Sequence, residues 1–165
     1  RDHCVTGVQT CALPICGYGF PMSLLLIKPE LDIWEPGEHN GTFRGNQLAF
    51  IGATAALEYK GNINLEQDVK EKELFLKSYL AQQIAPISDK IEIRGIGMIW
   101  GIDVKNFGGK SFAKTITSRC FEKGLIVEVA GRNSTVIKIL PPLVIDMPTL
   151  RKGSSIIKEA FNECL

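Results

Sequence analysis

Two parts of the first half of the chain carry patterns of apolar residues that predict regular elements. Residues 22–27 form a short continuous apolar run closed by Lys28, which predicts a buried strand. Asn46 then precedes a stretch rich in alanine and leucine, so we expect it to cap a helix over 46–60, with Gly61 ending that helix.

A longer helical pattern follows. One stripe of a helix that begins at Asn64 and stops before Pro86 is predicted by Leu65, Val69, Leu76, Leu80 and Ile84. The charged run from Asp68 to Glu73 predicts a mostly solvated face of this helix. Gln67, three residues after Asn64, suggests a partial capping box at its start.

The remainder of the chain alternates between strand-like and helix-like patterns. The expected order is a β-rich segment at 91–104, a helix at 111–123 ended by Gly124, strands at 125–129 and 136–140, and a last helix opened by Asp146 and Pro148. This alternation of helices with short strands indicates an α/β fold.

Composition narrows the possible partners. The chain has 165 residues, 45% of them hydrophobic, and a formal net charge of +1, which argues against nucleic acid or an anionic membrane as the main partner. No apolar run approaches the roughly 20 residues that span a bilayer. Five cysteines, an odd number without framework spacing, favour a reducing compartment, and we expect the cytoplasm. The sequence predicts no metal site, because His39 has no further ligand at a suitable spacing.

Residues 1–16 differ in character from the rest of the chain. The chain begins at Arg1, and the segment from Val5 to Ile15 resembles the translation of a sequencing adapter. We therefore expect residues 1–16 to be non-native and poorly ordered. A divergent natural N-terminus is the alternative.

The segment from His39 to Leu48 is the most informative in chemical terms. It combines two glycines, the hydroxyl of Thr42, the guanidinium of Arg44 and the helix cap Asn46. Small residues at a helix start, with a hydroxyl and an arginine nearby, suit an anion such as a phosphate. By itself this pattern occurs more often without a ligand than with one.

The order of these residues resembles the class III aminotransferases, which are pyridoxal-phosphate enzymes of fold type I. Thr42-Phe43-Arg44-Gly45-Asn46-Gln47 is similar to the diaminobutyrate–2-oxoglutarate transaminases of that class. The resemblance runs from Gly17 to the C-terminus and includes the Arg-Gly-x-Gly stretch that begins at Arg94. It implies that Thr42 contacts the phosphate of pyridoxal 5'-phosphate in a neighbouring subunit. For Arg94 itself we expect a structural ion pair or a contact with a carbonyl, and binding of a carboxylate is the alternative.

Lys138 is the second informative position. Many members of the class have an arginine in the strand before Pro-Pro-Leu that binds the substrate's α-carboxylate, and the diaminobutyrate subgroup resembles this chain in having lysine there. The resemblance therefore implies that Lys138 binds a substrate carboxylate, as a point charge rather than a bidentate fork. An ordinary surface lysine between two isoleucines is the alternative.

The resemblance places the Schiff-base lysine of the family where this chain has Leu13. It therefore implies the C-terminal portion of a fold type I transferase, without catalytic residues of its own and inactive by itself. The expected parts are a non-native segment at 1–16, the tail of the large cofactor domain and a bridging helix at 17–60, and a small C-terminal α/β domain at 61–165.

The implied reaction of the complete enzyme moves the amino group of glutamate to aspartate semialdehyde, giving 2,4-diaminobutyrate and 2-oxoglutarate, in a homodimer. Ectoine-type compatible-solute synthesis and the supply of siderophore or polyamine precursors stay open as pathways. The alternatives are an ornithine or 4-aminobutyrate transaminase, a non-catalytic dimerisation or binding module, and an unrelated phosphate-binding protein.

Overall fold

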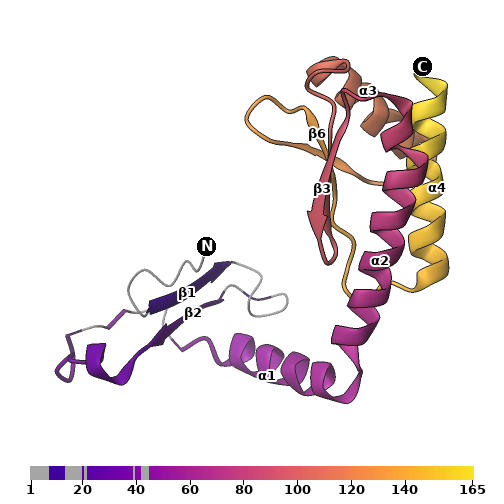
Figure 1. Ribbon diagram of the computed structural model, residues 1–165. Helices are drawn as coiled ribbons and strands as arrows, with labels where there is room; N and C mark the ends of the chain where they lie inside the picture. Colours follow the sequence, from indigo (N-terminus) through magenta and orange to yellow (C-terminus); the bar gives the residue numbers. More distant parts are fainter. Residues whose placement is uncertain (1–7, 14–19, 21, 39, 42–44) are drawn as a thin grey trace. The chain divides into compact units, whose positions relative to one another are not determined.

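The computed structural model describes residues 8–13, 20, 22–38, 40–41 and 45–165. The chain divides into two compact units, residues 1–63 and residues 64–165, and each is considered by itself (Figure 1).

The first unit contains a two-stranded antiparallel sheet. Strand β1 (Val8–Leu13) pairs with β2 (Met22–Ile27), and Leu13 lies opposite Met22. The strand predicted at 22–27 is confirmed. Part of the segment 1–16 is β1, which forms a ladder with β2, and the expectation of poor order over 1–16 stays a prediction. The adapter origin of the segment stays a prediction.

A short 3-10 helix, η1 (Pro29–Leu31), precedes the single long helix described in this unit, α1 (Gln47–Asn62). The predicted cap is confirmed, since the Asn46 side chain accepts a hydrogen bond of 3.3 Å from the amide of Ala49. The predicted end at Gly61 is wrong. The helix continues to Asn62 and finishes where the amide of Ile63 donates to the carbonyl of Tyr59.

The second unit is built on a four-stranded antiparallel sheet. Its strands are β3 (Glu92–Ile96), β4 (Ile99–Asp103), β5 (Glu128–Ala130) and β6 (Val136–Ile139). They lie in the order β3-β4-β6-β5. The register aligns Ile93, Ile102, Ile137 and Val129 across the sheet, so that one face is apolar.

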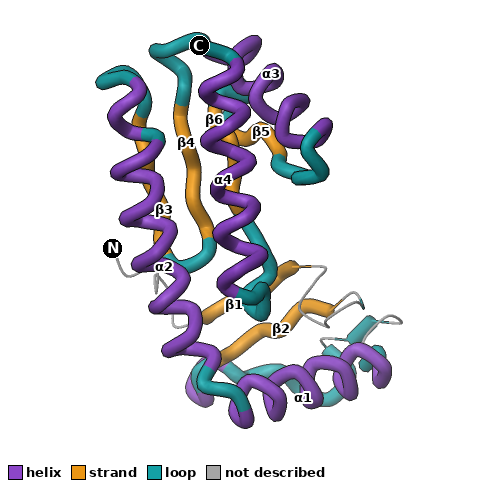
Figure 2. The backbone as a smooth tube through the Cα atoms, turned by 90° about the vertical axis from the view of Figure 1, so that its right-hand side faces the viewer, coloured by secondary structure: helices purple, strands orange, loops and turns teal. Residues whose placement is uncertain are grey.

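Three helices cover that apolar face, as Figure 1 and Figure 2 show from two directions. They are α2 (Leu65–Gln83), α3 (Gly109–Glu122) and α4 (Met147–Glu163), and the short 3-10 helix η2 (Ala85–Ile87) follows α2. Helices α2 and α4 contact each other, and α3 packs on β5, β6 and α4. This is an α/β layer arrangement, as the sequence predicts.

The core lies between these helices and the sheet. The predicted stripe of α2 is confirmed, because Leu76, Leu80 and Ile84 are fully or almost fully buried. Helix α4 contributes Leu150, Ile157 and Phe161 to this core.

Three of the four predicted helix ends in this unit are confirmed, the first being the end of α2 at Gln83, before Pro86. Asp146 caps α4 by accepting a hydrogen bond of 2.7 Å from the amide of Thr149. Gly124, at φ +82°, ends α3 in the left-handed conformation that favours glycine. The capping box of α2 is not formed, because Asn64 makes no side-chain cap and the Gln67 amide donates instead to Glu71.

The strand predicted at 125–129 is shorter and later than expected. Only Glu128–Ala130 pairs with β6. The amide of Leu125 donates to the carbonyl of Cys120 in closing α3, so residues 125–127 form an extended connection rather than a ladder. This connection becomes one wall of the site described below.

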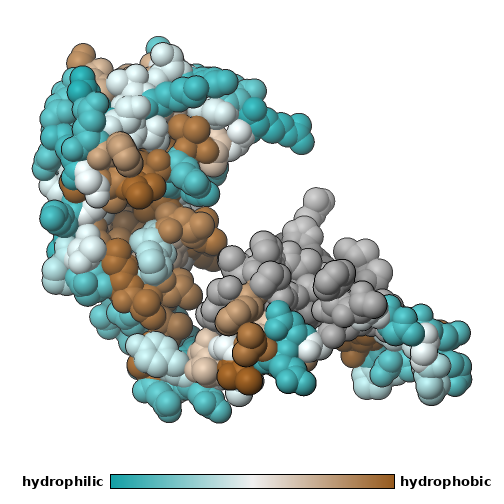
Figure 3. All heavy atoms as spheres, turned by 180° about the vertical axis from the view of Figure 1, so that it is seen from behind, coloured by the Kyte–Doolittle hydropathy of each residue, from teal (hydrophilic) through white to brown (hydrophobic). Residues whose placement is uncertain are grey.

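Hydrophobic side chains gather on one surface of the second unit (Figure 3). The exposed apolar residues of this unit include Ile96, Ile99, Ile126, Leu140 and Val144.

Candidate functional site

Lys138 lies on β6, at the centre of the sheet. Its Cα pairs with Gly101 of β4 on one side and with Glu128 of β5 on the other. The alternation of β6 buries Ile137 and Ile139 and directs Lys138 to the face opposite the helices, where it is partly exposed.

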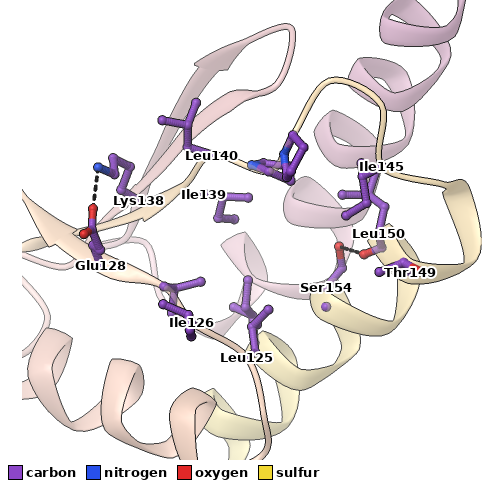
Figure 4. A pocket seen from close by; sticks show the side chains of 15 residues that line it. Leu125, Ile126, Glu128, Lys138, Ile139, Leu140, Ile145, Thr149, Leu150 and Ser154 are labelled. Carbon is purple, nitrogen blue, oxygen red and sulfur yellow. Dashed lines mark hydrogen bonds and ion pairs between the residues drawn. The ribbon is translucent and has the colours of Figure 1, made fainter. Parts of the chain in front are cut away.

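Lys138 forms an ion pair with Glu128 across the ladder. The Lys138 Nζ atom lies 2.6 Å from Oε2 of Glu128, which is itself 68% exposed (Figure 4). The hydrogen bond and the charge of Lys138 lower the pKa of Glu128. Because the carboxylate is solvated, the pair contributes little to stability.

This ion pair stands at the edge of a cavity of about 350 Å³. The cavity lies between the connection 125–127, the loop after β6 and the first half of α4 (Figure 4). Its walls are mostly apolar and include Leu125, Val127, Ile139, Leu140, Pro142, Ile145, Leu150 and Ile157. An apolar cavity with few polar groups at its edge is the usual form of a small-molecule site.

Two hydroxyl groups that line the cavity are already engaged. Ser154 donates to the carbonyl of Leu150 at 2.9 Å, and Thr149 donates to Asp146 at 2.9 Å. The charged groups at the edge of the cavity are Lys138 and Glu128, which are paired with each other on the sheet face opposite the helices.

Lys72 is a candidate functional residue that the sequence pattern does not indicate. It lies in the charged run 68–73 of α2, which reads as a solvated face, yet only 2% of its surface is exposed. Its ammonium forms an ion pair with Asp68 and donates to the carbonyl of Leu143 at 3.0 Å. A four-residue spacing to an aspartate is too common a helix pattern to have marked Lys72 as buried.

Arg94 forms the structural ion pair that the sequence predicts. Its guanidinium lies 3.0 Å from Asp103 on the neighbouring strand. Although burial opposes ionisation of Asp103, hydrogen bonds from the Lys105 amide, Arg94 and Thr135 hold the pKa of this carboxyl below its ordinary value.

The structure describes only some of the residues to which the resemblance gives a role with the cofactor. Thr42 and His39 lie outside the described residues, so the phosphate contact of Thr42 stays a prediction. Leu13 ends β1, and its hydrocarbon side chain cannot form an imine with pyridoxal phosphate. Among the described residues, Leu13 therefore does not fit the role of the imine-forming group.

Within the part of the chain that the structure describes, no three His, Cys, Asp or Glu side chains gather as metal ligands. Among the same residues, no helix combines the length and apolar character needed to cross a bilayer.

Known proteins similar to this chain fall in one class. The chain is 46% identical over 150 residues to a diaminobutyrate–2-oxoglutarate transaminase of Wolinella succinogenes, covering 90% of this chain and 34% of the relative. It is 43% identical over 159 residues to the same-named protein of Streptomyces avermitilis, covering 94% of this chain and 37% of the relative. The chain thus spans about a third of the length of the curated relatives it matches.

Solved structures give the same result for the fold. An acetylornithine aminotransferase from Elizabethkingia anophelis superposes with a TM-score of 0.82 at 26% identity, over 95% of this chain and 41% of the other. An ornithine aminotransferase from Toxoplasma gondii superposes with a TM-score of 0.85 at 22% identity, over 99% of this chain and 38% of the other. These are fold type I aminotransferases, and the predicted fold class is confirmed.

A family profile described as aminotransferase class III matches residues 8–161. The match begins at residue 8, before Gly17 where the resemblance was expected to start. The match covers nearly the whole chain and includes Arg94 on β3 and Lys138 on β6. The chain belongs to the class III aminotransferases.

Proposed function

We propose that the protein to which this chain contributes transfers the amino group of glutamate to aspartate semialdehyde, producing 2,4-diaminobutyrate and 2-oxoglutarate. The cofactor of the complete enzyme is pyridoxal 5'-phosphate, in keeping with the family. The acetylornithine and ornithine aminotransferases share the fold, whereas the identities of 40–46% fall mainly on proteins named diaminobutyrate–2-oxoglutarate transaminase.

The observation that carries this proposal is the lysine at position 138. It stands on β6 beside a cavity, where its ammonium is paired with the solvated carboxylate of Glu128. A substrate carboxylate can take the place of Glu128 and keep the same charge-assisted hydrogen bond. Lys138 then fixes one end of the substrate, while Arg94 stays committed to Asp103.

We further propose that residues 1–165 alone do not catalyse transamination, because Leu13 occupies the position that the resemblance gives to the imine-forming lysine. Residues supplied by another part of the polypeptide or by a partner chain are needed. A homodimer in the cytoplasm is the expected form of the complete enzyme, and light scattering on that enzyme measures its assembly.

The experiment uses a chimera. Residues 17–165 replace the matching segment of the Wolinella relative, and the product of glutamate with aspartate semialdehyde is measured by chromatography. The expected result is 2,4-diaminobutyrate formation in the chimera and none with the purified 165-residue chain. A preference of the chimera for succinate semialdehyde or for ornithine would move the assignment to another class III activity. Turnover by the isolated chain would contradict its predicted inactivity.

The role of Lys138 is tested in the same chimera. Lys138→Gln removes the charge and should raise KM for glutamate by about tenfold or more, as expected for a lost hydrogen bond to a charged group. Lys110→Gln, which removes an exposed lysine at the start of α3, is the matched control. Equal KM values for the two variants would show that Lys138 is an ordinary surface lysine without a role in substrate binding.

A further inference from the structure

The loop between β6 and α4 forms one wall of the Lys138 cavity. Leu140, Pro141, Pro142 and Ile145 all line that cavity. The loop starts directly after β6, two residues beyond Lys138. Any displacement of the loop therefore changes the shape of this cavity, at whose edge Lys138 lies.

Hydrophobic packing holds only part of this loop. Leu143 is 48% exposed and Val144 is 59% exposed, so the middle of the loop is not anchored by its side chains. A turn in which the Ile145 amide donates to the Pro142 carbonyl shapes the loop locally. That turn does not attach the loop to the rest of the unit.

Lys72 makes this attachment from α2. Its Nζ atom donates to the Leu143 carbonyl, 71 positions away in the sequence. The same ammonium is paired with Asp68 one helical turn earlier, which fixes its direction. Lys72 also faces Asp146, the cap of α4, and its charge adds to the hydrogen bonds from Thr149 that lower the pKa of Asp146.

Burial of a lysine at such a place calls for an explanation. Lysine is almost never fully buried unless it is paired, because removing an ammonium from water is costly. Replacement of a buried ion pair by apolar residues of similar volume is often neutral or stabilising. Stability alone therefore does not account for a buried lysine here, whereas a defined position of the loop does.

We propose that Lys72 is a positioning residue, which holds the loop 140–145 against α2 and so sets the wall of the cavity beside Lys138. Lys72 does not touch the ligand; it acts through the Leu143 carbonyl. The link to substrate rests on the proposed function, but the attachment of the loop can be measured without it.

The first experiment uses the whole 165-residue chain and amide hydrogen exchange. Lys72→Met keeps the length of the side chain and removes its ammonium. The expected result is exchange about tenfold faster at residues 143–146, the size of effect that follows from losing one charge-assisted hydrogen bond. Strands β3 and β4 should keep their protection. Lys70→Met, which removes an exposed lysine of the same helix, is the control and should leave all exchange rates unchanged.

The second experiment places the same variants in the chimera and separates KM from kcat. Lys72→Met should raise KM for glutamate by about fivefold with kcat within about twofold, because binding geometry changes while the reacting groups remain. Lys72→Arg, which keeps a cation and its donors, should restore most of the KM. A residue that served stability alone would leave KM and kcat of the folded fraction unchanged.

The outcomes separate the two proposals. Unchanged exchange at 143–146 in Lys72→Met overturns the attachment, whatever the activity of the chimera. A chimera that makes no 2,4-diaminobutyrate with the native segment refutes the proposed function, while faster exchange still supports the attachment. If both Lys72→Met and the milder Lys72→Gln fail to fold, Lys72 is a stability residue and the positioning role is wrong.

Discussion

The Nζ atom of Lys138 lies 2.6 Å from Glu128, its direct neighbour across the β5–β6 ladder. Lys138 is proposed to bind a substrate carboxylate, and in this structure the carboxylate of Glu128 takes that place. Glu128 competes for the same ammonium, so the strength of this pair sets how readily Lys138 accepts another anion.

Glu128→Gln should lower KM for glutamate in the chimera by about threefold, because removal of an exposed ion pair frees Lys138 at little cost to stability. Steady-state kinetics measure the change. Glu122→Gln is the matched control, since Glu122 is an exposed carboxylate paired with Arg119 on α3. A raised KM in Glu128→Gln would instead mean that Glu128 orients Lys138 for binding.

Gly95 and Gly153 should respond oppositely to alanine. A Cβ on Gly95 would lie 2.4 Å from the Trp100 ring and 2.5 Å from the Ile99 carbonyl, so Gly95→Ala should destabilise the fold by roughly 2 kcal/mol. In helix α4 a Cβ on Gly153 meets only Leu125 at 3.5 Å, so Gly153→Ala should stabilise by about 0.5–1 kcal/mol. Urea unfolding measures both. A stabilising Gly95→Ala would contradict the close packing of the β3–β4 hairpin.

Asp103 should make stability depend on pH in the acid range. Its pKa is lowered in the folded chain, because hydrogen bonds from the Lys105 amide, Arg94 and Thr135 outweigh the effect of burial. The contribution is therefore complete above the ordinary aspartate pKa and is lost as the pH falls through the lower folded value.

Asp103→Asn should destabilise the chain by about 1–3 kcal/mol at pH 7, as expected when hydrogen bonds to a charged group are lost. The difference from the unmodified chain should shrink as the pH is lowered toward 3. Urea unfolding at several pH values measures this, with the exposed Asp89→Asn as the control. A difference that stays constant with pH would show that the carboxylate charge of Asp103 is unimportant.

Cys120 should resist alkylation in the folded chain. It is completely buried, and burial raises the pKa of its thiol to about 11. At pH 8 the thiolate fraction is then about 100-fold lower than at the ordinary value of 9.0, and the thiolate is the reactive form.

Mass mapping after iodoacetamide treatment should therefore find Cys120 unmodified in the folded chain and modified in urea. Cys164, which is partly exposed, provides the comparison within the same sample. Equal labelling of the two cysteines would mean that α3 opens on the time scale of the reaction.

Local elements and the family could be predicted from the amino-acid sequence. Asn46, Gly124 and Asp146 were recognised as helix ends because each acts on backbone groups within a few residues. The stripe formed by Leu76 and Leu80 was recognised because helical periodicity is itself local. The motif around Thr42 identified the class, although its contacts lie outside the described residues.

The tertiary structure decided what depends on distant partners. Lys72 looked like one charge in a solvated run, and only the Leu143 carbonyl, 71 positions later, explains its burial. Residues 125–127 have a strand-like composition, yet they do not pair in the sheet. The amide of Leu125 donates instead to the carbonyl of Cys120 at the end of α3. The pairing of Lys138 with Glu128 likewise depends on the register of two strands, which no single segment encodes. Caps and stripes are local interactions, whereas burial, register and the walls of a cavity arise only when separate segments pack together.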